Sequence, residues 1–126
     1  MPFSGNLAPT LKPYNILELP IYYIDYSDLV DPRSDFDLQH LGLEQPGLKV
    51  FDFHPNIVFT NASSCEDYER TRSSYHDYDC LLKERRPGRG VRTLLIDLLD
   101  YLAANGQGKK TLAELNTAWR NGCGGR

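Results

Sequence analysis

The sequence predicts an α/β fold, and three segments carry this prediction. Residues 20–25 and 48–54 are rich in branched and aromatic side chains, which is typical of strands. The third segment starts at Val91, has leucines at helical spacing, and ends at Asn105 and Gly106, a common helix stop. Two strands and a long amphipathic helix indicate a sheet layer covered by helices.

Size, charge and composition restrict the possible classes of protein. The chain has 126 residues, enough for one domain or part of one. Apolar residues make up 40% and charged residues 25%, a composition that supports a folded core. The net charge is −3 and only Lys83 to Arg92 concentrates basic residues, so we expect no nucleic-acid partner. No apolar run approaches the roughly 20 residues of a membrane span and no secretory signal is present, so we expect a cytoplasmic protein without a membrane partner.

The shorter segments divide the chain into a lead-in, a domain and a tail. Residues 1–15 are rich in proline, glycine and asparagine and predict an irregular lead-in. Residues 16–120 form the predicted partial domain, and residues 121–126 a flexible tail. Cys65, Cys80 and Cys123 have neither metal-site nor disulfide-framework spacing, so we expect free thiols.

Within the domain, local signals predict four further segments. They are a short helix near Phe36 to Leu43, a polar helix that Ser64 caps, a loop at residues 73–80, and a last helix that the capping box Thr111 to Glu114 opens. Leu112, Leu115 and Trp119 fall on one face of that last helix. Residues 56–61 fit either a strand extension or the start of a crossover loop.

The strand at residues 48–54 places ionisable side chains among apolar ones. Because side chains alternate along a strand, Asp52 and His54 share one face, and Phe51 and Phe53 share the other. The carboxyl end of a strand in a parallel sheet opens toward the ligand-binding cleft, where His54 would lie. A carboxylate on the same face can keep this histidine protonated, as a general acid requires. The alternative is a histidine that bonds a backbone carbonyl at the strand end, and the sequence leaves both open.

Other charged segments allow both a functional and a structural interpretation. Asp25 ends the first strand and Asp28 follows three residues later, so both are candidate functional carboxylates, although aspartates are also common in solvated turns. Residues 75–79 offer oxygen and imidazole ligands, but their spacing matches no defined metal site. The basic loop before Val91 could hold an anion at a helix N-terminus, although a solvated charge run is the more common case.

Five segments together resemble a known family. In chain order they are "LELPIYYIDYSD", "GLKVFDFHPNIVFTN", "CEDYERTR", "GRGVRTLLIDLLDYL" and "TLAEL", and "FDFHP" with the following long helix is the specific part. The segments resemble the C-terminal part of NodB-like polysaccharide deacetylases, especially the WbmS-like branch, over residues 17–115. The resemblance implies the C-terminal half of a deformed (β/α) barrel, a fold that needs about 200 residues or more when complete.

The resemblance also implies a function and a set of site residues. Members of this family are hydrolases that use a divalent, zinc-like metal to remove N-acetyl groups from polysaccharide, acting on C–N bonds that are not peptide bonds. His54 matches their general acid, and Asp25 and Asp28 match the acidic pair before it, although Leu29 replaces an aromatic residue and Asp52 a leucine. We therefore predict His54 (general acid), Asp52 and Asp25 as catalytic. The predicted carbohydrate contacts are Tyr23, Tyr26, Asp28 and Asn61.

One part of the family pattern does not match. The early Asp-Asp motif, the His-x-x-x-His metal ligands and an Arg-containing motif should precede residue 17, and "LKPY" at residues 11–14 lacks the arginine. We therefore expect a chain that binds no metal and is incomplete and inactive alone, with strand edges open to self-association. The alternative function is a non-catalytic carbohydrate-binding or interaction module, with Tyr22, Tyr23 and Tyr26 as stacking surfaces.

Overall fold

The computed structural model describes residues 8–105 and 108–124, and its centre is a two-stranded parallel sheet. Strand β3 (Ile21–Ile24) pairs with β4 (Val50–Asp52), so that Ile21 lies opposite Val50 and Ile24 opposite Asp52. Both predicted strands are therefore confirmed, although the second is shorter than predicted. The parallel pairing brings the carboxyl ends of the two strands to the same edge of the sheet.

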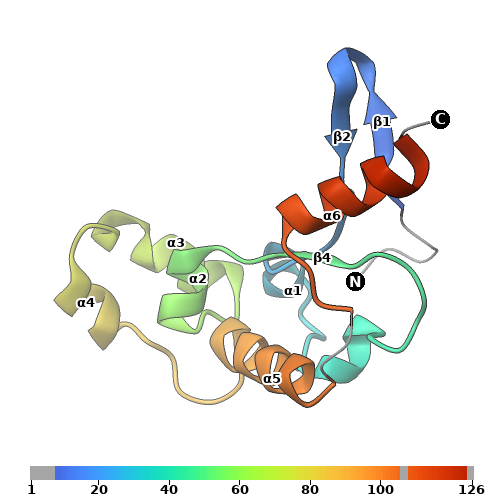
Figure 1. Cartoon of the computed structure of the whole chain (residues 1–126). Helices are drawn as coiled ribbons and strands as arrows, with labels where there is room; N and C mark the ends of the chain where they lie inside the picture. Colours follow the sequence, from blue (N-terminus) through green and yellow to red (C-terminus); the bar gives the residue numbers. More distant parts are fainter. Residues whose placement is uncertain (1–7, 106–107, 125–126) are drawn as a thin grey trace.

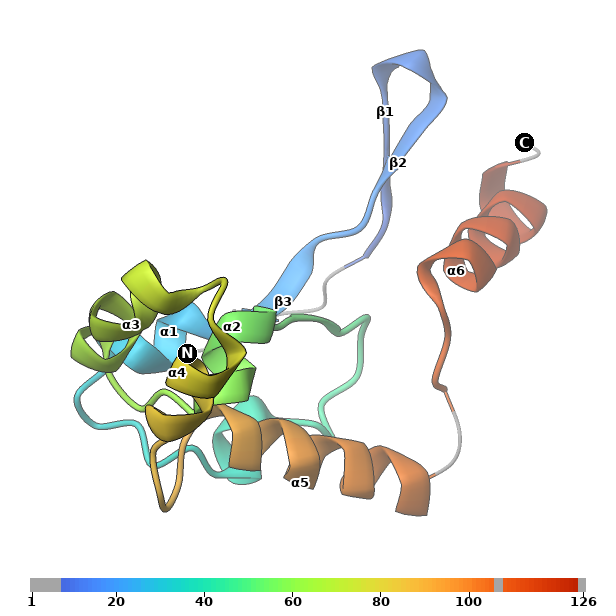
Figure 2. The same ribbon diagram turned by 90° about the vertical axis from the view of Figure 1, so that its left-hand side faces the viewer.

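A β-hairpin precedes the sheet. Strand β1 (Thr10–Lys12) pairs antiparallel with β2 (Ile16–Glu18), and the 3₁₀ turn η1 (Pro13–Asn15) joins them. The hairpin projects from the part of the molecule that contains β3, β4 and helices α1 to α5 (Figures 1 and 2). The irregular lead-in predicted for residues 1–15 is therefore wrong for residues 10–15, while residues 1–7 lie outside the described residues. Tyr14 and Asn15 adopt positive φ values, and this left-handed backbone reverses the chain where composition alone suggested no element.

Short helices follow the two strands. They are α1 (Tyr26–Val30), η2 (Leu38–Leu41), α2 (Pro55–Thr60), α3 (Cys65–Thr71), η3 (Arg72–Ser74) and α4 (Tyr78–Lys83). The turn η2 confirms the helical segment predicted near Phe36 to Leu43, and α3 has its predicted cap, because the Ser64 side chain accepts from the Asp67 N–H.

Two of the sequence predictions in this region are wrong. Residues 56–60 belong to helix α2 and not to a strand extension or loop, because Pro55 suits the first helical turn and Asn61, which follows Thr60, ends the helix with a positive φ. The predicted loop at residues 73–80 contains the start of α4, because the Asp77 side chain caps that helix at the Cys80 N–H.

Two longer helices complete the chain. Helix α5 (Val91–Ala104) is confirmed and buries Val91, Leu94 and Leu98, while Gly106 of its predicted stop lies outside the described residues. Helix α6 (Leu112–Trp119) has the predicted capping box and continues as one π-helical turn, η4 (Arg120–Gly124). None of the helices within residues 8–105 and 108–124 has both the length and the apolar character needed to cross a membrane.

The core lies between the sheet and α5. Its buried members come from β3, α1, η2, α2 and α5 and from the loop residues Phe36 and Ala62. Phe51 of β4 and Phe53, which follows β4, pack against the core, as the alternation predicted. The Tyr23 ring contacts both phenylalanines, with ring centroids 6.0 and 5.6 Å away. Tyr22 and Tyr23 are only 6% and 2% exposed, so the prediction that they form a sugar-stacking surface is wrong. The same strand that builds the core therefore also leads directly into Asp25.

Candidate functional site

The two parallel strands position Asp25 and His54 side by side. Asp25 directly follows β3, and His54 comes two residues after β4 ends at Asp52. The Asp25 N–H donates to the Asp52 carbonyl at 3.1 Å, which extends the pairing by one residue beyond β3. The carboxyl ends of neighbouring parallel strands are where α/β proteins usually place functional groups.

Asp25 holds His54 through both of its carboxylate oxygens. Oδ2 accepts the His54 backbone N–H at 2.7 Å, and Oδ1 lies 2.7 Å from His54 Nδ1. Because Oδ1 belongs to a carboxylate, Nδ1 is assigned the proton and donates it. The Asp25 side chain is completely buried, whereas the His54 side chain is 44% exposed. The ring is therefore fixed on its Nδ1 side and open to solvent elsewhere.

The pair shifts the proton affinities of both partners. Burial raises the pKa of Asp25, and the hydrogen bonds from His54 partly offset this. The hydrogen bond to Asp25 raises the pKa of His54, with a smaller contribution from the charge of Asp52. The carboxylate that bonds the His54 ring is thus Asp25 and not Asp52, the partner that strand alternation predicted. The physical reason is that the parallel pairing of β3 and β4 brings Asp25 to this strand end, and alternation along a single strand does not indicate a contact between strands.

Asp28 forms a second pair, with His40, and the histidine of this pair is less exposed than His54. Asp28 is 3% exposed and accepts from Ser34 Oγ at 2.9 Å, from His40 Nε2 at 3.1 Å and from the Tyr23 hydroxyl. Burial opposes ionisation, but these hydrogen bonds outweigh it and lower the pKa of Asp28. Both Asp25 and Asp28 are therefore buried, so the alternative of two solvated turn carboxylates is wrong.

His40 is the site residue that sequence reasoning missed. It lies in η2, twelve positions after Asp28, in a segment without a periodic pattern that would have indicated its partner. Its hydrogen bond to Asp28 raises its pKa, and its Nδ1 contacts the Asp37 carbonyl. Both ring nitrogens therefore face acceptors of this chain, which suits a protonated imidazole.

Asn61 has a structural position and not the predicted sugar contact. Its side-chain N–H₂ donates to the Arg86 and Gly88 carbonyls at 2.9 and 3.0 Å, and its Oδ1 accepts from the Arg92 and Thr93 N–H groups at 3.0 and 3.3 Å. The residue is 3% exposed, so the amide is unavailable to a ligand. These two N–H groups are also the ones that an anion at the start of α5 would need, so Asn61 occupies the place of the anion that the sequence allowed as the less common alternative.

The other predicted carbohydrate contacts differ in exposure. Tyr23 is buried and its hydroxyl bonds Asp28, so neither of these two side chains can reach a sugar. Tyr26 is 41% exposed and directly follows Asp25 in the chain. Of the four predicted contacts, Tyr26 is the one that is open to a ligand.

The donor set does not fit the divalent metal that the resemblance implies. In the described part of the chain, no three His, Cys, Asp or Glu side chains gather closely enough to hold a metal ion. A zinc site needs three or four protein ligands, whereas Asp25 and Asp28 direct their oxygens to donors of this chain.

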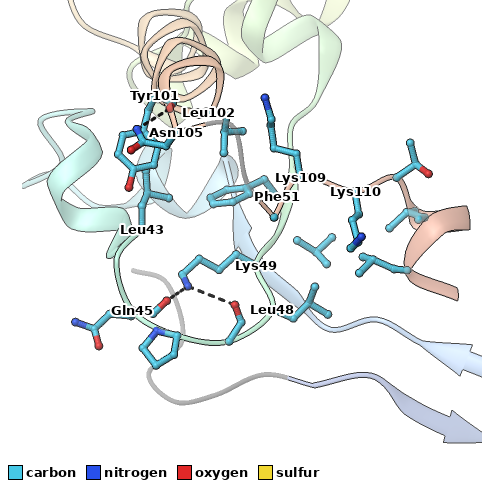
Figure 3. Close-up of a pocket in the computed structure, with 17 residues that line it drawn as sticks. Leu43, Gln45, Leu48, Lys49, Phe51, Tyr101, Leu102, Asn105, Lys109 and Lys110 are labelled. Atoms are coloured by element: carbon cyan, nitrogen blue, oxygen red, sulfur yellow. Dashed lines mark hydrogen bonds between the residues drawn. The ribbon is translucent and has the colours of Figure 1, made fainter. Parts of the chain in front are cut away.

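A cavity of about 700 Å³ lies at the other end of β4, around Lys49 (Figure 3). It is lined by residues 45–51, by the end of α5 and by residues 108–112, and His54 is not among its lining residues. Lys49 Nζ is directed at the Gln45 carbonyl and at the Gly47 carbonyl, 3.5 Å away. The cavity is thus separate from the Asp25–His54 pair.

Comparisons with known proteins show the family of the chain. The family model described as "WbmS-like: Polysaccharide deacetylase" matches residues 1–72, which is more than half of the chain. The chain belongs to this family of polysaccharide deacetylases. Among curated proteins, no significant match was found.

A solved structure also resembles the chain. It is WbmS of Bordetella bronchiseptica, described as a polysaccharide deacetylase involved in O-antigen biosynthesis, with 28% sequence identity and a TM-score of 0.63. The match covers 77% of this chain and 40% of the Bordetella protein. The α/β fold and the family are thereby confirmed, and the chain spans well under two thirds of this relative.

Proposed function

We propose that this chain supplies the general-acid side of a carbohydrate N-deacetylase site, with His54 as the acid and Asp25 as its positioning residue. The observation that carries the proposal is the Asp25–His54 pair at the carboxyl ends of two parallel strands. A fully buried carboxylate fixes one side of the ring, and the ring remains 44% exposed on its other side. Family membership supports carbohydrate amides as the substrate class.

The geometry suits proton donation to a leaving amine. Hydrolysis of an N-acetyl group breaks the C–N bond, and the nitrogen must gain a proton before it leaves as an amine. With Nδ1–H donated to Asp25, the proton available for transfer is on His54 Nε2. Because the bond to Asp25 raises the pKa of His54, a larger fraction of the ring carries this proton near neutral pH. Acetate and the free amine are the products.

A second part of the proposal concerns the metal-binding side chains, which do not gather into a site among the described residues. A deacetylase of this family activates water with a divalent metal, and the described side chains do not form a site for one. We infer that the chain is one half of a deformed (β/α) barrel and is inactive alone.

Turnover measurements test the acid role. In a full-length family member that carries residues 8–124 of this chain in place of its own matching segment, His54→Ala should lower the turnover number about 100-fold or more and change KM little. Acetate release from N-acetylated oligosaccharide is the assay. The isolated chain with added zinc or cobalt should release none. An unchanged turnover number in the His54→Ala protein, or EDTA-sensitive release by the isolated chain, would contradict the proposal.

A second candidate is a non-catalytic carbohydrate-binding module. The absence of a metal donor set within residues 8–105 and 108–124 favours it, together with the exposed His54 ring and Tyr26. Such a module would bind oligosaccharide, yet the chimeric enzyme would lose no turnover when His54 is replaced. The same turnover assay therefore separates the two functions.

A further inference from the structure

The cavity around Lys49 has the size and the lining of a binding site (Figure 3). Three segments enclose it: residues 43–51 up to and within β4, the C-terminal end of α5, and the segment that leads from residue 108 into α6. Its volume of about 700 Å³ is within the range of small-molecule sites. Because His54 is not among the lining residues, the acid chemistry leaves this cavity unused.

The walls of the cavity are mainly aliphatic. Its branched aliphatic side chains are Leu43, Leu48, Val50, Leu102, Leu112 and Leu115. The Phe51 ring also lines it, but this ring packs edge-on against Tyr22, with centroids 5.9 Å apart, and belongs to the core. Aliphatic walls favour a flexible hydrocarbon chain, since each methylene that they cover is removed from water, whereas a planar base would be stacked on an open aromatic face.

Helix α6 turns part of its apolar face toward this cavity. Leu112 and Leu115 lie on that face and both line the cavity, yet Leu112 is 60% exposed. An exposed leucine in a concave site gains free energy when a ligand covers it. The cavity therefore offers apolar surface that residues 8–105 and 108–124 do not cover.

The polar part of the lining is positively charged. Lys49, Lys109 and Lys110 line the cavity, and no aspartate or glutamate is among its lining residues. The chain as a whole is acidic, with a net charge of −3, so this composition is a local departure. Within the two described ranges, none of the three lysines forms an ion pair. A cavity lined by charge of one sign attracts a ligand of the other sign.

Lys49 is already held in place. Its Nζ contacts the Gln45 carbonyl, lies 3.5 Å from the Gly47 carbonyl, and is 5.5 Å from the centroid of the Tyr22 ring. An ammonium group has three N–H donors, so two carbonyls leave the third for an anion. Because these contacts orient the ammonium group, a ligand needs to order it little on binding.

We propose that this cavity binds an amphipathic anion, namely a single aliphatic chain that ends in a carboxylate. The chain lies against the leucines, and the carboxylate is held by Lys49 and by the Lys109–Lys110 pair. The site lies beyond the proposed function and does not depend on it.

Calorimetric titration of the whole chain with decanoate, below its micelle concentration, tests the site. Hexanoate should bind about tenfold or more weakly than decanoate, because each fully buried methylene contributes about fourfold in affinity (about 0.8 kcal/mol). Decanol, which has the same chain without the charge, should bind about threefold or more weakly than decanoate. Equal affinities for decanoate and decanol, or no binding of decanoate, would overturn the proposal.

Lysine variants test the charge. Lys49→Met and the double variant Lys109→Met with Lys110→Met keep a hydrocarbon side chain and remove the ammonium groups. Each should weaken decanoate about threefold to fivefold and leave decanol unchanged. Lys83→Met, at an exposed position at the end of α4 outside the cavity, is the matched control. An equal loss of decanoate affinity in Lys83→Met would reduce the effect to net charge and overturn the site.

Leucine variants test the apolar wall. Leu112→Ser should weaken both decanoate and decanol, whereas Leu99→Ser, at a position that is 55% exposed and does not line the cavity, should weaken neither. Circular dichroism confirms that each variant is folded. The opposite result would place the ligand on the outer face of α5. If the wild type binds no decanoate and Leu112→Ser shifts light scattering toward monomer, a second copy of the chain occupies the cavity and the proposal falls.

Amide NMR spectra locate the ligand directly. Decanoate should shift resonances of residues 45–51 and 108–112 and leave those of Asp25 and His54 in place. Shifts centred on Asp25 and His54 would overturn the site. His54→Ala should retain the full affinity for decanoate whether or not it loses turnover in the chimeric enzyme, so the acid role and this site can fail separately.

Discussion

Asp25 and Asp28 are buried carboxylates, and each of them contacts one histidine. The two pairs differ in how many of the histidine ring nitrogens face an acceptor. His40 is 24% exposed at its side chain and turns both nitrogens toward acceptors, Asp28 and the Asp37 carbonyl. The His54 side chain is 44% exposed, and of its two ring nitrogens only Nδ1 has a partner in the described part of the chain. At the residue scale, the Asp28–His40 pair therefore suits a role in folding stability, and the Asp25–His54 pair suits proton transfer.

The first prediction concerns the charge that holds His54. In Asp25→Asn the pKa of His54 should fall, because a neutral amide no longer stabilises the protonated ring. Histidine resonances followed by NMR across pH measure this directly. Asp52→Asn should lower the pKa of His54 by less, since Asp52 contributes only the smaller charge effect. The pKa of His40 is the internal reference, and an equal fall in both single variants would contradict the pairing.

The second prediction concerns the stability that His40 contributes. The folded pKa of His40 is raised, so its contribution is complete below the pKa of about 6.5 of an unfolded histidine and is lost as pH rises through the folded value. The free energy of unfolding should therefore fall between about pH 6 and about pH 8.5, a range in which the lowered pKa of Asp28 keeps its carboxylate ionised. His54 adds to the fall for the same reason.

Urea denaturation at the two pH values provides the measurement. His40→Gln should reduce the pH dependence, whereas His76→Gln, which replaces a histidine on the exposed segment before α4, should retain it. A stability that rises with pH in this range would mean that the Asp28–His40 contact does not hold a protonated ring.

Residue-scale features were predictable from sequence only where the signal was local. His54 and Asp25 were found because each closely follows a recognisable strand. Asn61 was misassigned because its partners lie 25 to 32 positions away, and no local pattern indicates such a contact. The same holds for His40, whose importance depends on the burial of Asp28.

At the scale of elements, the junction between α2 and α5 depends on Asn61. The residue ends α2 with a positive φ and caps the first N–H groups of α5, so one side chain fixes two helices. Gly90 precedes α5, and a Cβ there would lie 2.5 Å from Asn61 Oδ1. The close approach therefore requires glycine at position 90.

The third prediction follows from this junction. Asn61→Ala should lower the free energy of unfolding by about 1–3 kcal/mol, because it leaves buried carbonyl and N–H groups without partners. Thr111→Ala removes an exposed cap of α6 and is the matched control, with a loss of about 1 kcal/mol or less. Urea denaturation followed by circular dichroism compares the two. Equal losses would show that Asn61 is no more than an ordinary helix cap.

Elements with a regular hydrophobic spacing or a local capping motif were predicted from the sequence, whereas elements set by single backbone conformations were not. The leucine spacing of α5 and the capping box of α6 are encoded within a few residues. The β1–β2 hairpin depends on the positive φ values of Tyr14 and Asn15, which propensity does not indicate.

At the scale of the molecule, the parallel pairing of β3 and β4 followed from the α/β prediction, whereas the half-barrel remains a proposal.

The last prediction concerns how the whole molecule behaves in solution. Within the described ranges, β3 and β4 pair only with each other, and the β1–β2 hairpin forms a separate sheet that projects away from them (Figures 1 and 2). Each strand therefore leaves one row of backbone N–H and C=O groups unpaired, beside an Ile21 side chain that is 44% exposed. We expect the chain to self-associate through this edge, and light scattering at micromolar concentration should report a mass above that of one chain.

Two lysine substitutions locate the contact. Ile21→Lys places a charge on the β3 edge and should shift the population toward monomer, because edge lysines oppose strand pairing. Leu99→Lys, on an α5 position that is 55% exposed, is the matched control and should leave association unchanged. Association lost only with Leu99→Lys would assign the contact to the helix face. A monomer with a cooperative thermal transition would instead mean that two strands suffice for an independent domain, and this outcome would favour the carbohydrate-binding module over half of an enzyme.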